Sequence, residues 1–360
     1  MEVVKGVYQI KIPLSERLSH DDDARPIKAS KDKLVDAIEQ NILGPRSVSY
    51  VNVYLIEGNK ENLLIDTGWD TPDAFSALNK EFKNYGFTFK DISQIVITHF
   101  HPDHYGLAGK LKQICGGKIA LSKVEADLLD SRYINPDELL KEIRRFLLAH
   151  GVPKKEVTKL SEVSMPAQKL VTPTKPDILL KTGKKIVVDP FEFKVLLTPG
   201  HSPGHICLYE PNRKLLFTGD HILPDITPHV GLHPQSGENP LGGYLSSLQE
   251  LLKLEVNLAF PGHGASFSGV RQIGENLLRH HEQRRAAILK ALQEDMKSGY
   301  QIAMELPWRS DIKPISFEAL HVFDQRLAIM ETLAHIESLC KDGKVQKIEQ
   351  DGAILYFAGG

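Results

Sequence analysis

The sequence has few cysteines and no long apolar run. Only three of its 360 residues are cysteine, and Cys115, Cys207 and Cys340 lie far apart. An odd and scattered set of thiols argues against a disulfide framework or a CxxC zinc site, and it fits a reducing compartment. No apolar segment approaches the ~20 residues that a membrane-spanning helix needs. The first residues lack the basic and then apolar pattern of a secretory signal, so we expect a cytoplasmic protein without a membrane partner.

The chain also lacks an excess of charge of either sign. It has 44 Lys and Arg against 46 Asp and Glu, a formal net charge of −2, which gives no bulk attraction to nucleic acid or to an anionic membrane. With 41% hydrophobic residues, a chain of this length can bury a large core and predicts about two domains. The unusual feature is its fifteen histidines.

Short apolar runs alternate with helical patterns over the first 270 residues. Runs such as 50–57, 62–66, 92–98, 206–209 and 215–218 predict strands, and segments after Thr71-Pro72 and around 107–115 predict helices. This alternation predicts a layered α/β fold. The segment 14–49 interrupts the pattern and contains a candidate helix at 31–40. A helical insertion at about 123–170 fits either a packing helix pair or a lid over the site.

The last ninety residues have a different pattern. Helices are predicted at 276–296, 317–328 and 330–341, followed by a hairpin of 345–348 and 353–357 around Asp351-Gly352. This order predicts a winged-helix-like domain at 271–360, behind a catalytic domain at 1–270. Residues 276–360 hold eleven Lys and Arg and twelve Asp and Glu. A net charge of −1 favours packing, pocket closure or dimerisation over duplex binding.

A cluster of metal-ligand residues follows the predicted strand at 92–98. In Thr98-His99-Phe100-His101-Pro102-Asp103-His104, residues two apart in an extended stretch point the same way. His99 and His101 can therefore converge on one ion, while the following turn aims Asp103 and His104 at a second ion. Imidazole and carboxylate ligands suit Zn²⁺, Fe or Mn.

Three more ligand candidates also follow strands. His201, Asp220 and His263 each come directly after a glycine, which permits tight loops and close backbone approach. We expect His99, His101 and His201 to hold one metal. We expect Asp103, His104 and His263 to hold the other, with Asp220 bridging them. Two divalent ions, Zn²⁺ by default with Fe or Mn as alternatives, would bind a shared hydroxide and stabilise an oxyanion. The competing interpretation is a set of scattered loop and core histidines.

These motifs together carry a family resemblance. THFHPDH, Asp66-Thr67-Gly68, TPGHSPGH, FTGD and PGHG are similar to those of the metallo-β-lactamase superfamily over roughly residues 1–270. The resemblance implies an αββα sandwich with a dinuclear site at one edge, and it implies that Asp66 orients the site from behind the ligands. Asp220 stands where zinc β-lactamases have cysteine, which argues against antibiotic hydrolysis. His101 stands where flavo-diiron proteins have glutamate, which argues against oxygen reduction.

The C-terminal segment narrows the resemblance to one subgroup of this superfamily. The segment after PGHG and the winged-helix pattern resemble the subgroup that includes the animal β-lactamase-like protein 2. The animal member is similar to a single-strand RNA endonuclease, and fungal relatives act as acyl-carrier thioesterases. The resemblance therefore implies metal-dependent hydrolysis and leaves the bond open.

Other histidines receive supporting roles. His221 and His205 are predicted to hold ligands by hydrogen bonds. His229 and His233, in a proline-rich loop, are assigned to the surface or to a supporting shell.

Three functions remain open from the sequence. The first is hydrolysis of an ester or thioester in a small-molecule or acyl substrate, with Asp103 or Asp220 moving the proton. The second is cleavage of single-stranded RNA at the same site. The third is a non-catalytic module that binds nucleic acid through the tail. The sequence leaves monomer and homodimer equally open.

Overall fold

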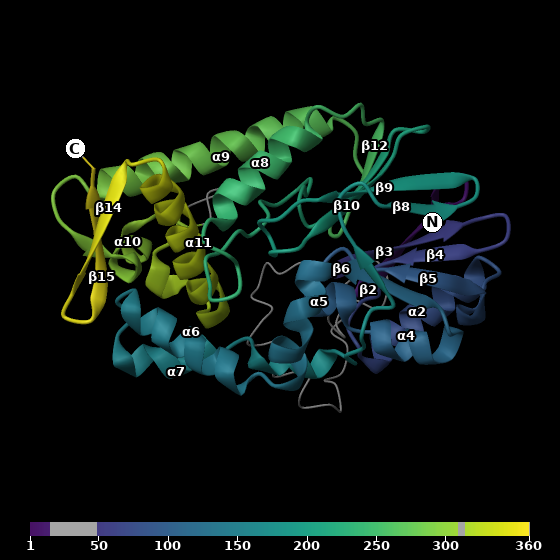
Figure 1. Cartoon of the computed structure of the whole chain (residues 1–360), viewed down its shortest axis with the longest axis horizontal. Coiled ribbons are helices and arrows are strands. Elements are labelled where there is room, and N and C mark those ends of the chain that lie inside the picture. Colours follow the sequence, from purple (N-terminus) through teal and green to yellow (C-terminus); the bar gives the residue numbers. More distant parts are fainter. Residues whose placement is uncertain (15–48, 309–313, 360) are drawn as a thin grey trace, which may run out of the picture.

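Twelve of the fifteen strands in the described residues form two sheets that pack face to face, at the right of Figure 1. The computed structural model describes residues 1–14, 49–308 and 314–359. The larger sheet runs in the order β1 (Glu2–Val4), β2 (Val7–Pro13), β3 (Tyr50–Glu57), β4 (Asn62–Ile65), β5 (Ile92–Val96), β6 (Lys118–Ser122) and β7 (Ile178–Leu180). The smaller sheet runs in the order β12 (Leu258–Pro261), β11 (Leu215–Gly219), β10 (Ile206–Glu210), β9 (Phe191–Leu197) and β8 (Lys185–Val188).

The core between the sheets is rich in aromatic rings. Phe217 and Phe260 stack with their centroids 4.5 Å apart, and Tyr54 from the larger sheet meets Phe217 edge-on at 5.2 Å. All three side chains are buried. The strand β3 is buried on both faces, which explains its nearly continuous apolar sequence.

Helices cover the outer face of each sheet. α2 (Pro72–Asn84) and α4 (Ala108–Cys115) pack on the larger sheet, and α8 (Pro240–Leu251) and α9 (Val270–Ala291) pack on the smaller one. The predicted start of α2 is confirmed, since the Thr71 hydroxyl accepts a hydrogen bond from the Ala74 amide. The α/β class and the αββα order of layers predicted from the sequence are therefore confirmed.

The insertion and the tail form a second part of the molecule, outside the sandwich. The insertion contains α5 (Lys123–Leu129), a π-helical turn at Asp130–Ile134, α6 (Asp137–Ala149), α7 (Lys154–Glu162) and a 3₁₀ turn at Met165–Leu170. The tail contains β13 (Lys297–Ser298), α10 (Gly299–Glu305), α11 (Val322–Lys341), β14 (Val345–Gln350) and β15 (Ala353–Ala358). Its three strands pair in the order β13-β15-β14.

One prediction for the tail is wrong. The two helices predicted at 317–328 and 330–341 are a single helix, α11, preceded by a short 3₁₀ turn at Phe317–Ala319. No glycine or proline lies between residues 322 and 341, so nothing in the sequence interrupts the helix there. The predicted hairpin is present, and Asp351 and Gly352 both adopt positive φ at its turn.

The insertion and the tail share one hydrophobic core. Leu147 of α6 and Leu160 of α7 are buried in the same cluster as Ile288, Leu333 and Tyr356. Figure 1 shows α6 and α7 lying beside the C-terminal elements, away from the two sheets of the sandwich. The helix α9 joins the two halves, because its first turns pack on the smaller sheet and its last turns enter this second core.

The candidate helix at 31–40 and most of segment 14–49 lie outside the described residues. Within the described ranges, no helix is long and apolar enough to cross a lipid bilayer.

We predict that Leu333→Ala lowers the free energy of unfolding by about 2–5 kcal/mol, because it leaves a cavity in the core shared by insertion and tail. Urea denaturation measures the change. The control is Val187→Thr, which keeps a β-branched side chain at a position with 57% exposure and is expected to change stability by less than about 0.5 kcal/mol. Equal effects from the two substitutions would contradict the shared core.

Candidate metal centre

The seven predicted ligands meet at one edge of the sandwich. His99 and His101 follow β5, Asp103 and His104 lie in the short helix α3 (Pro102–Tyr105), His201 precedes β10, Asp220 follows β11, and His263 follows β12. Both sheets therefore contribute loops to the same edge. This is the arrangement that the positions of these residues after strands predict.

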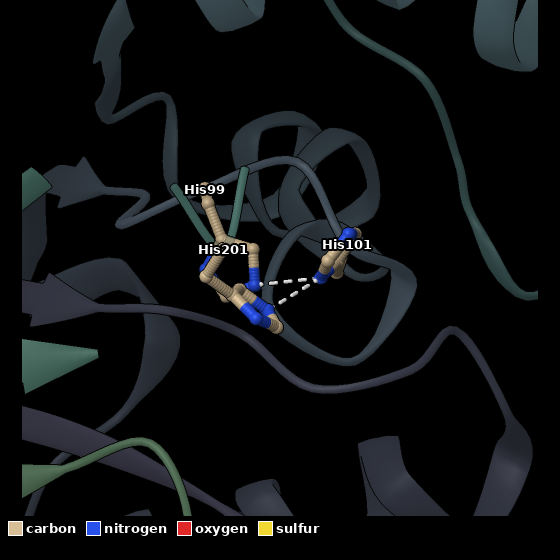
Figure 2. Close-up of side chains that lie close together, drawn as sticks. All are labelled: His99, His101 and His201. Atoms are coloured by element: carbon tan, nitrogen blue, oxygen red, sulfur yellow. Dashed lines mark hydrogen bonds between the residues drawn. The ribbon is translucent and has the colours of Figure 1, made fainter. Parts of the chain in front are cut away.

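The first group of ligands consists of three histidines. The Nδ1 of His101 lies 3.0 Å from the Nε2 of His99 and 2.9 Å from the Nε2 of His201. Figure 2 shows these three rings turned toward one another. Three nitrogens at this spacing leave room for one cation between them.

The second group combines carboxylates and histidines. The Nε2 of His263 lies 3.2 Å from the Oδ2 of Asp103 and 3.3 Å from the Oδ2 of Asp220. The same Asp220 oxygen lies 3.5 Å from the Nε2 of His104 and 3.6 Å from the Nε2 of His201. Because His201 belongs to the first group, Asp220 lies between the two groups, as the sequence predicts for a bridging ligand.

The chemistry of these donors fits divalent metal ions. Three sets of three ligand atoms each lie within 4.8 Å of one another. The Nε2 of His104 and the Oδ1 of Asp220 are buried and have no hydrogen-bond partner among the described residues. Buried polar atoms are seldom left unpaired, and a cation would satisfy both.

Asp66 orients two of the ligands from behind. Its carboxylate accepts a hydrogen bond from the Nδ1 of His104 at 2.8 Å and from the amide and hydroxyl of Thr98. The Thr98 hydroxyl in turn lies 3.0 Å from the Nδ1 of His99. These contacts fix both rings with Nε2 toward the site, which agrees with the supporting role that the family resemblance implies for Asp66.

Backbone carbonyls orient the remaining histidines. The Nδ1 of His201 donates to the carbonyl of His229, and the Nδ1 of His263 donates to the carbonyl of Tyr50, both at 2.8 Å. The assignment of His229 to a supporting shell is therefore confirmed, and its backbone makes the contact. Its ring is half-buried and its Nε2 donates to the carbonyl of Leu327 in the tail.

The prediction for His221 is wrong. Both nitrogens of its buried ring lack a hydrogen-bond partner within the described ranges, and the ring packs against Tyr244 and His205. The same prediction for His205 is confirmed. Its Nε2 accepts from the backbone amide of Asp220 at 3.1 Å, while its Nδ1 bonds the Thr198 hydroxyl. A histidine beside a ligand in sequence need not face it, because Asp220 and His221 lie on different sides of a turn.

The electrostatics divide the site into two halves. Burial and the neighbouring imidazoles hold the pKa values of His99 and His101 well below their usual range, so both rings are neutral ligands. Burial also lowers the pKa of His263, but Asp220 and Asp103 outweigh it and raise the value to about 10. Asp220, Asp103 and Asp66 likewise raise the pKa of His104 against the effect of burial. A bound cation would displace these two protons.

The loop that carries His263 is held by the opposite sheet. Asn52 on β3 donates hydrogen bonds across to this loop, including one from its backbone amide to the Gly262 carbonyl at 2.7 Å. A side chain at Gly262 would place its Cβ 2.2 Å from Asp220 Oδ1 and 2.7 Å from the His104 ring. The close approach of these two ligands therefore requires glycine at this position.

The sequence analysis missed Glu125, which ties two ligand loops together. Its buried carboxylate accepts hydrogen bonds from the amides of Phe100 at 2.8 Å and Gly204 at 2.6 Å, and from the Ser202 hydroxyl. The only sequence signal is Ser122-x-x-Glu125, which resembles a capping box. The Ser122 hydroxyl does cap α5, but the glutamate side chain turns to the site loops instead.

A cavity of about 510 Å³ opens beside the ligands, within the size range of small-molecule sites. Four ligand candidates line it: His101, Asp103, His201 and His263. The opposite wall comes from the insertion and the tail, with apolar side chains that include Leu139, Ile143, Met165, Phe323, Leu327 and Met330. His233, which was predicted to have a surface or supporting role, also lines the cavity.

Comparisons with known proteins agree with this geometry. A family model described as "Metallo-beta-lactamase superfamily" matches residues 46–263. A Bacillus subtilis protein named "Probable metallo-hydrolase YqjP" is 26% identical over 89% of this chain and 97% of its own length. The "Beta-lactamase-like protein 2 homolog" of Caenorhabditis elegans is 25% identical over 88% of each chain. The crystal structure of a metallo-beta-lactamase family protein from Thermus thermophilus superposes with a TM-score of 0.75 at 29% identity, over 99% of both chains.

We predict that Glu125→Gln weakens metal binding about 10–100-fold, because an amide nitrogen then faces the backbone N–H donors that the carboxylate holds. Competition with a chelator measures the affinity. Asp127→Asn is the control on the same helix, since Asp127 is exposed and pairs only with Lys123. Unchanged metal affinity in Glu125→Gln would show that the two loops hold their positions without this carboxylate.

Proposed function

Because the chain belongs to the metallo-beta-lactamase superfamily, we propose that it hydrolyses an ester or thioester of an acyl substrate with two divalent metal ions. When bound, such a pair would supply a hydroxide nucleophile at neutral pH and positive charge for the developing oxyanion. The observation that carries the proposal is the apolar cavity, which the insertion and tail close over the ligand residues.

The protein residues have distinct tasks in this reaction. Asp220 contacts both ligand groups, so it sets their separation. Asp103 lines the cavity, whereas Asp220 does not. A proton that moves to the leaving group must cross the cavity, and Asp103 is therefore the residue that we assign to proton transfer. Leu139, Ile143 and Phe323 exclude water from the acyl chain.

The burial of α11 supports an acyl substrate over a nucleic acid. In the winged-helix interpretation of the tail, α11 would occupy the position of the recognition helix. Its Ile329, Leu333 and Ile336 are fully or almost fully buried, and its first turns line the cavity. A helix packed in this way cannot enter a groove of DNA. We therefore assign the tail to pocket closure rather than to nucleic-acid docking.

Single-stranded RNA remains the second candidate substrate. The subgroup resemblance of the sequence motifs favours it, since the animal member of that subgroup is similar to a single-strand RNA endonuclease. It requires a strand to leave the cavity at both ends, and it predicts affinity that falls steeply with salt concentration.

We predict that acyl-thioesters release free thiol only in the presence of divalent metal, and that His101→Ala lowers this rate by at least about 100-fold. A thiol-reactive dye measures release across a series of chain lengths. His280→Ala is the matched control, because His280 lies on α9 outside the cavity. Metal-dependent cleavage of single-stranded RNA without thiol release from any thioester would favour the second candidate.

The bridging position of Asp220 gives a separate prediction about metal content. Asp220→Asn should lower metal occupancy in both groups, since its Oδ2 faces His201 on one side and His263 on the other. Asp103→Asn should leave about one metal per chain, because Asp103 contacts only the second group. Mass spectrometry of dialysed protein measures the metal-to-protein ratio. Equal losses in the two variants would argue against a bridging carboxylate.

A further inference from the structure

Two arginines lie in the cavity wall opposite the metal ligands. Arg132 comes from the π-helical turn Asp130–Ile134 of the insertion, and Arg326 comes from α11 of the tail. Arg326 is only 8% exposed. Neither belongs to the ligand set, and the proposed reaction assigns no task to either.

Neither guanidinium group forms an ion pair with a carboxylate in the described part of the chain. Burial lowers the pKa of Arg132, and the charge of Glu125 opposes only part of that effect. Arg326 donates to the carbonyl of Ser161 and to the hydroxyl of Ser164, which are both neutral. The Nε of Arg132 is buried without a hydrogen-bond partner, and its guanidinium packs 4.0 Å above the ring of Phe100. Asp324 also lines the cavity, and its side chain is not free, because it already takes part in another interaction.

The two positive charges lie close enough to affect each other. Burial, together with the charge of Arg132, lowers the pKa of Arg326 to about 10. Arg326 therefore remains protonated at neutral pH. The contact of Arg132 with the ring of Phe100, which lies between His99 and His101 in sequence, places it beside the first ligand group.

His233 adds a third donor to the same wall. Its Nδ1 accepts a hydrogen bond from the amide of Gln235 at 3.2 Å, so the neutral ring carries its proton on Nε2. Burial first, and then Arg132 and Arg326, hold its pKa well below the usual range. The ring is therefore neutral and close to both arginines.

A buried and a half-buried guanidinium, neither ion-paired to a carboxylate among the described residues, are costly to fold. Perturbed charges in a cleft are typical of functional sites, and an anionic ligand would supply the missing charge. Guanidinium groups match the paired oxygens of a carboxylate or a phosphate in a planar, two-bonded geometry. The cavity joins these donors to the metal ligands, so one small molecule can reach both.

We infer that the preferred substrate is an ester or thioester that carries a second anionic group, a carboxylate or a phosphate, held by Arg132, Arg326 and His233. This inference rests on the proposed hydrolysis and specifies its substrate class. It assigns specificity to Arg132 of the insertion, Arg326 of the tail and His233 of the loop between β11 and α8.

The test compares thioesters of one neutral thiol, N-acetylcysteamine, that differ only at the end of the acyl chain. The acyl groups are glutaryl, 4-phosphonobutanoyl and the uncharged pentanoyl. For the metal-loaded protein we expect kcat/KM to be about 10–100-fold higher for an anionic thioester than for pentanoyl. Comparison of the glutaryl and 4-phosphonobutanoyl thioesters distinguishes a site for a carboxylate from a site for a phosphate.

Substitutions at Arg132 separate recognition from structure. Arg132→Gln is expected to bring the anionic-to-neutral ratio close to one, and Arg132→Lys to restore part of it. The thermal midpoint of Arg132→Gln should not fall, because the substitution removes a half-buried charge that has no ion-paired carboxylate among the described residues. Arg145→Gln, an exposed arginine on α6, is the control and should keep the native ratio. A native ratio near one, or an unchanged ratio in Arg132→Gln, overturns the inference.

A binding measurement distinguishes failure of this inference from failure of the proposed hydrolysis. Calorimetry of metal-stripped full-length protein with glutarate, and separately with inorganic phosphate, removes any contribution from metal ions. We expect at least one of these anions to bind the native protein about 10-fold more tightly than it binds Arg132→Gln. If that difference appears and no thioester is cleaved, the anion site stands and the hydrolysis proposal fails. If thioesters are cleaved and neither anion distinguishes the two proteins, the hydrolysis stands and the anion site is wrong.

Discussion

The carboxylate of Asp220 lies between two groups of ligands, and much of the surrounding structure keeps it there. One of its oxygens is within 3.6 Å of histidines from three different loops. The amide of Asp220 is bound by His205, and Gly262 leaves the space that its other oxygen occupies. The aromatic core between the sheets sets the separation of the strands from which these loops come. The packing of the sandwich and the position of this one carboxylate therefore depend on each other.

The convergence of the candidate ligands could be predicted from the sequence because most of them follow strands with a clear apolar pattern, and Asp103 and His104 lie in the short helix directly after one. His99, His201 and His263 come to one edge once the strands are ordered, and the glycines before His201 and His263 mark close approach. Glu125 could not be found in the same way. Its spacing from Ser122 fits an ordinary helix cap, and the amides that it binds belong to two loops far away in sequence. His221 shows the converse error, since adjacency to a ligand does not determine where a ring points.

The packing of the insertion against the tail also could not be predicted from the sequence. Both have clear helical periodicity, but periodicity shows which face of a helix is apolar and not which partner covers it. The structure pairs Leu147 and Leu160 with Ile288 and Leu333 in one core. As a result, the insertion and the tail, which are not part of the αββα sandwich, together form the cavity wall that faces the ligands. Differences in substrate among relatives with the same ligands can arise in this wall without any change at the metal centre.

The shared core also sets an order of events during synthesis. The apolar face of α6 and α7 is translated nearly 200 residues before β15, which completes its core. At ribosomal rates of about 5–20 residues per second, that face waits roughly 10–40 s for its partner. The strands of the sandwich are all complete by residue 261, so the ligand loops can assemble while the opposite wall of the cavity is still missing. The growing chain thus exposes an open ligand cluster and an uncovered apolar helix pair together. The cavity wall is complete once α11 has been made, whereas the core of the helix pair is complete only when the last hairpin follows.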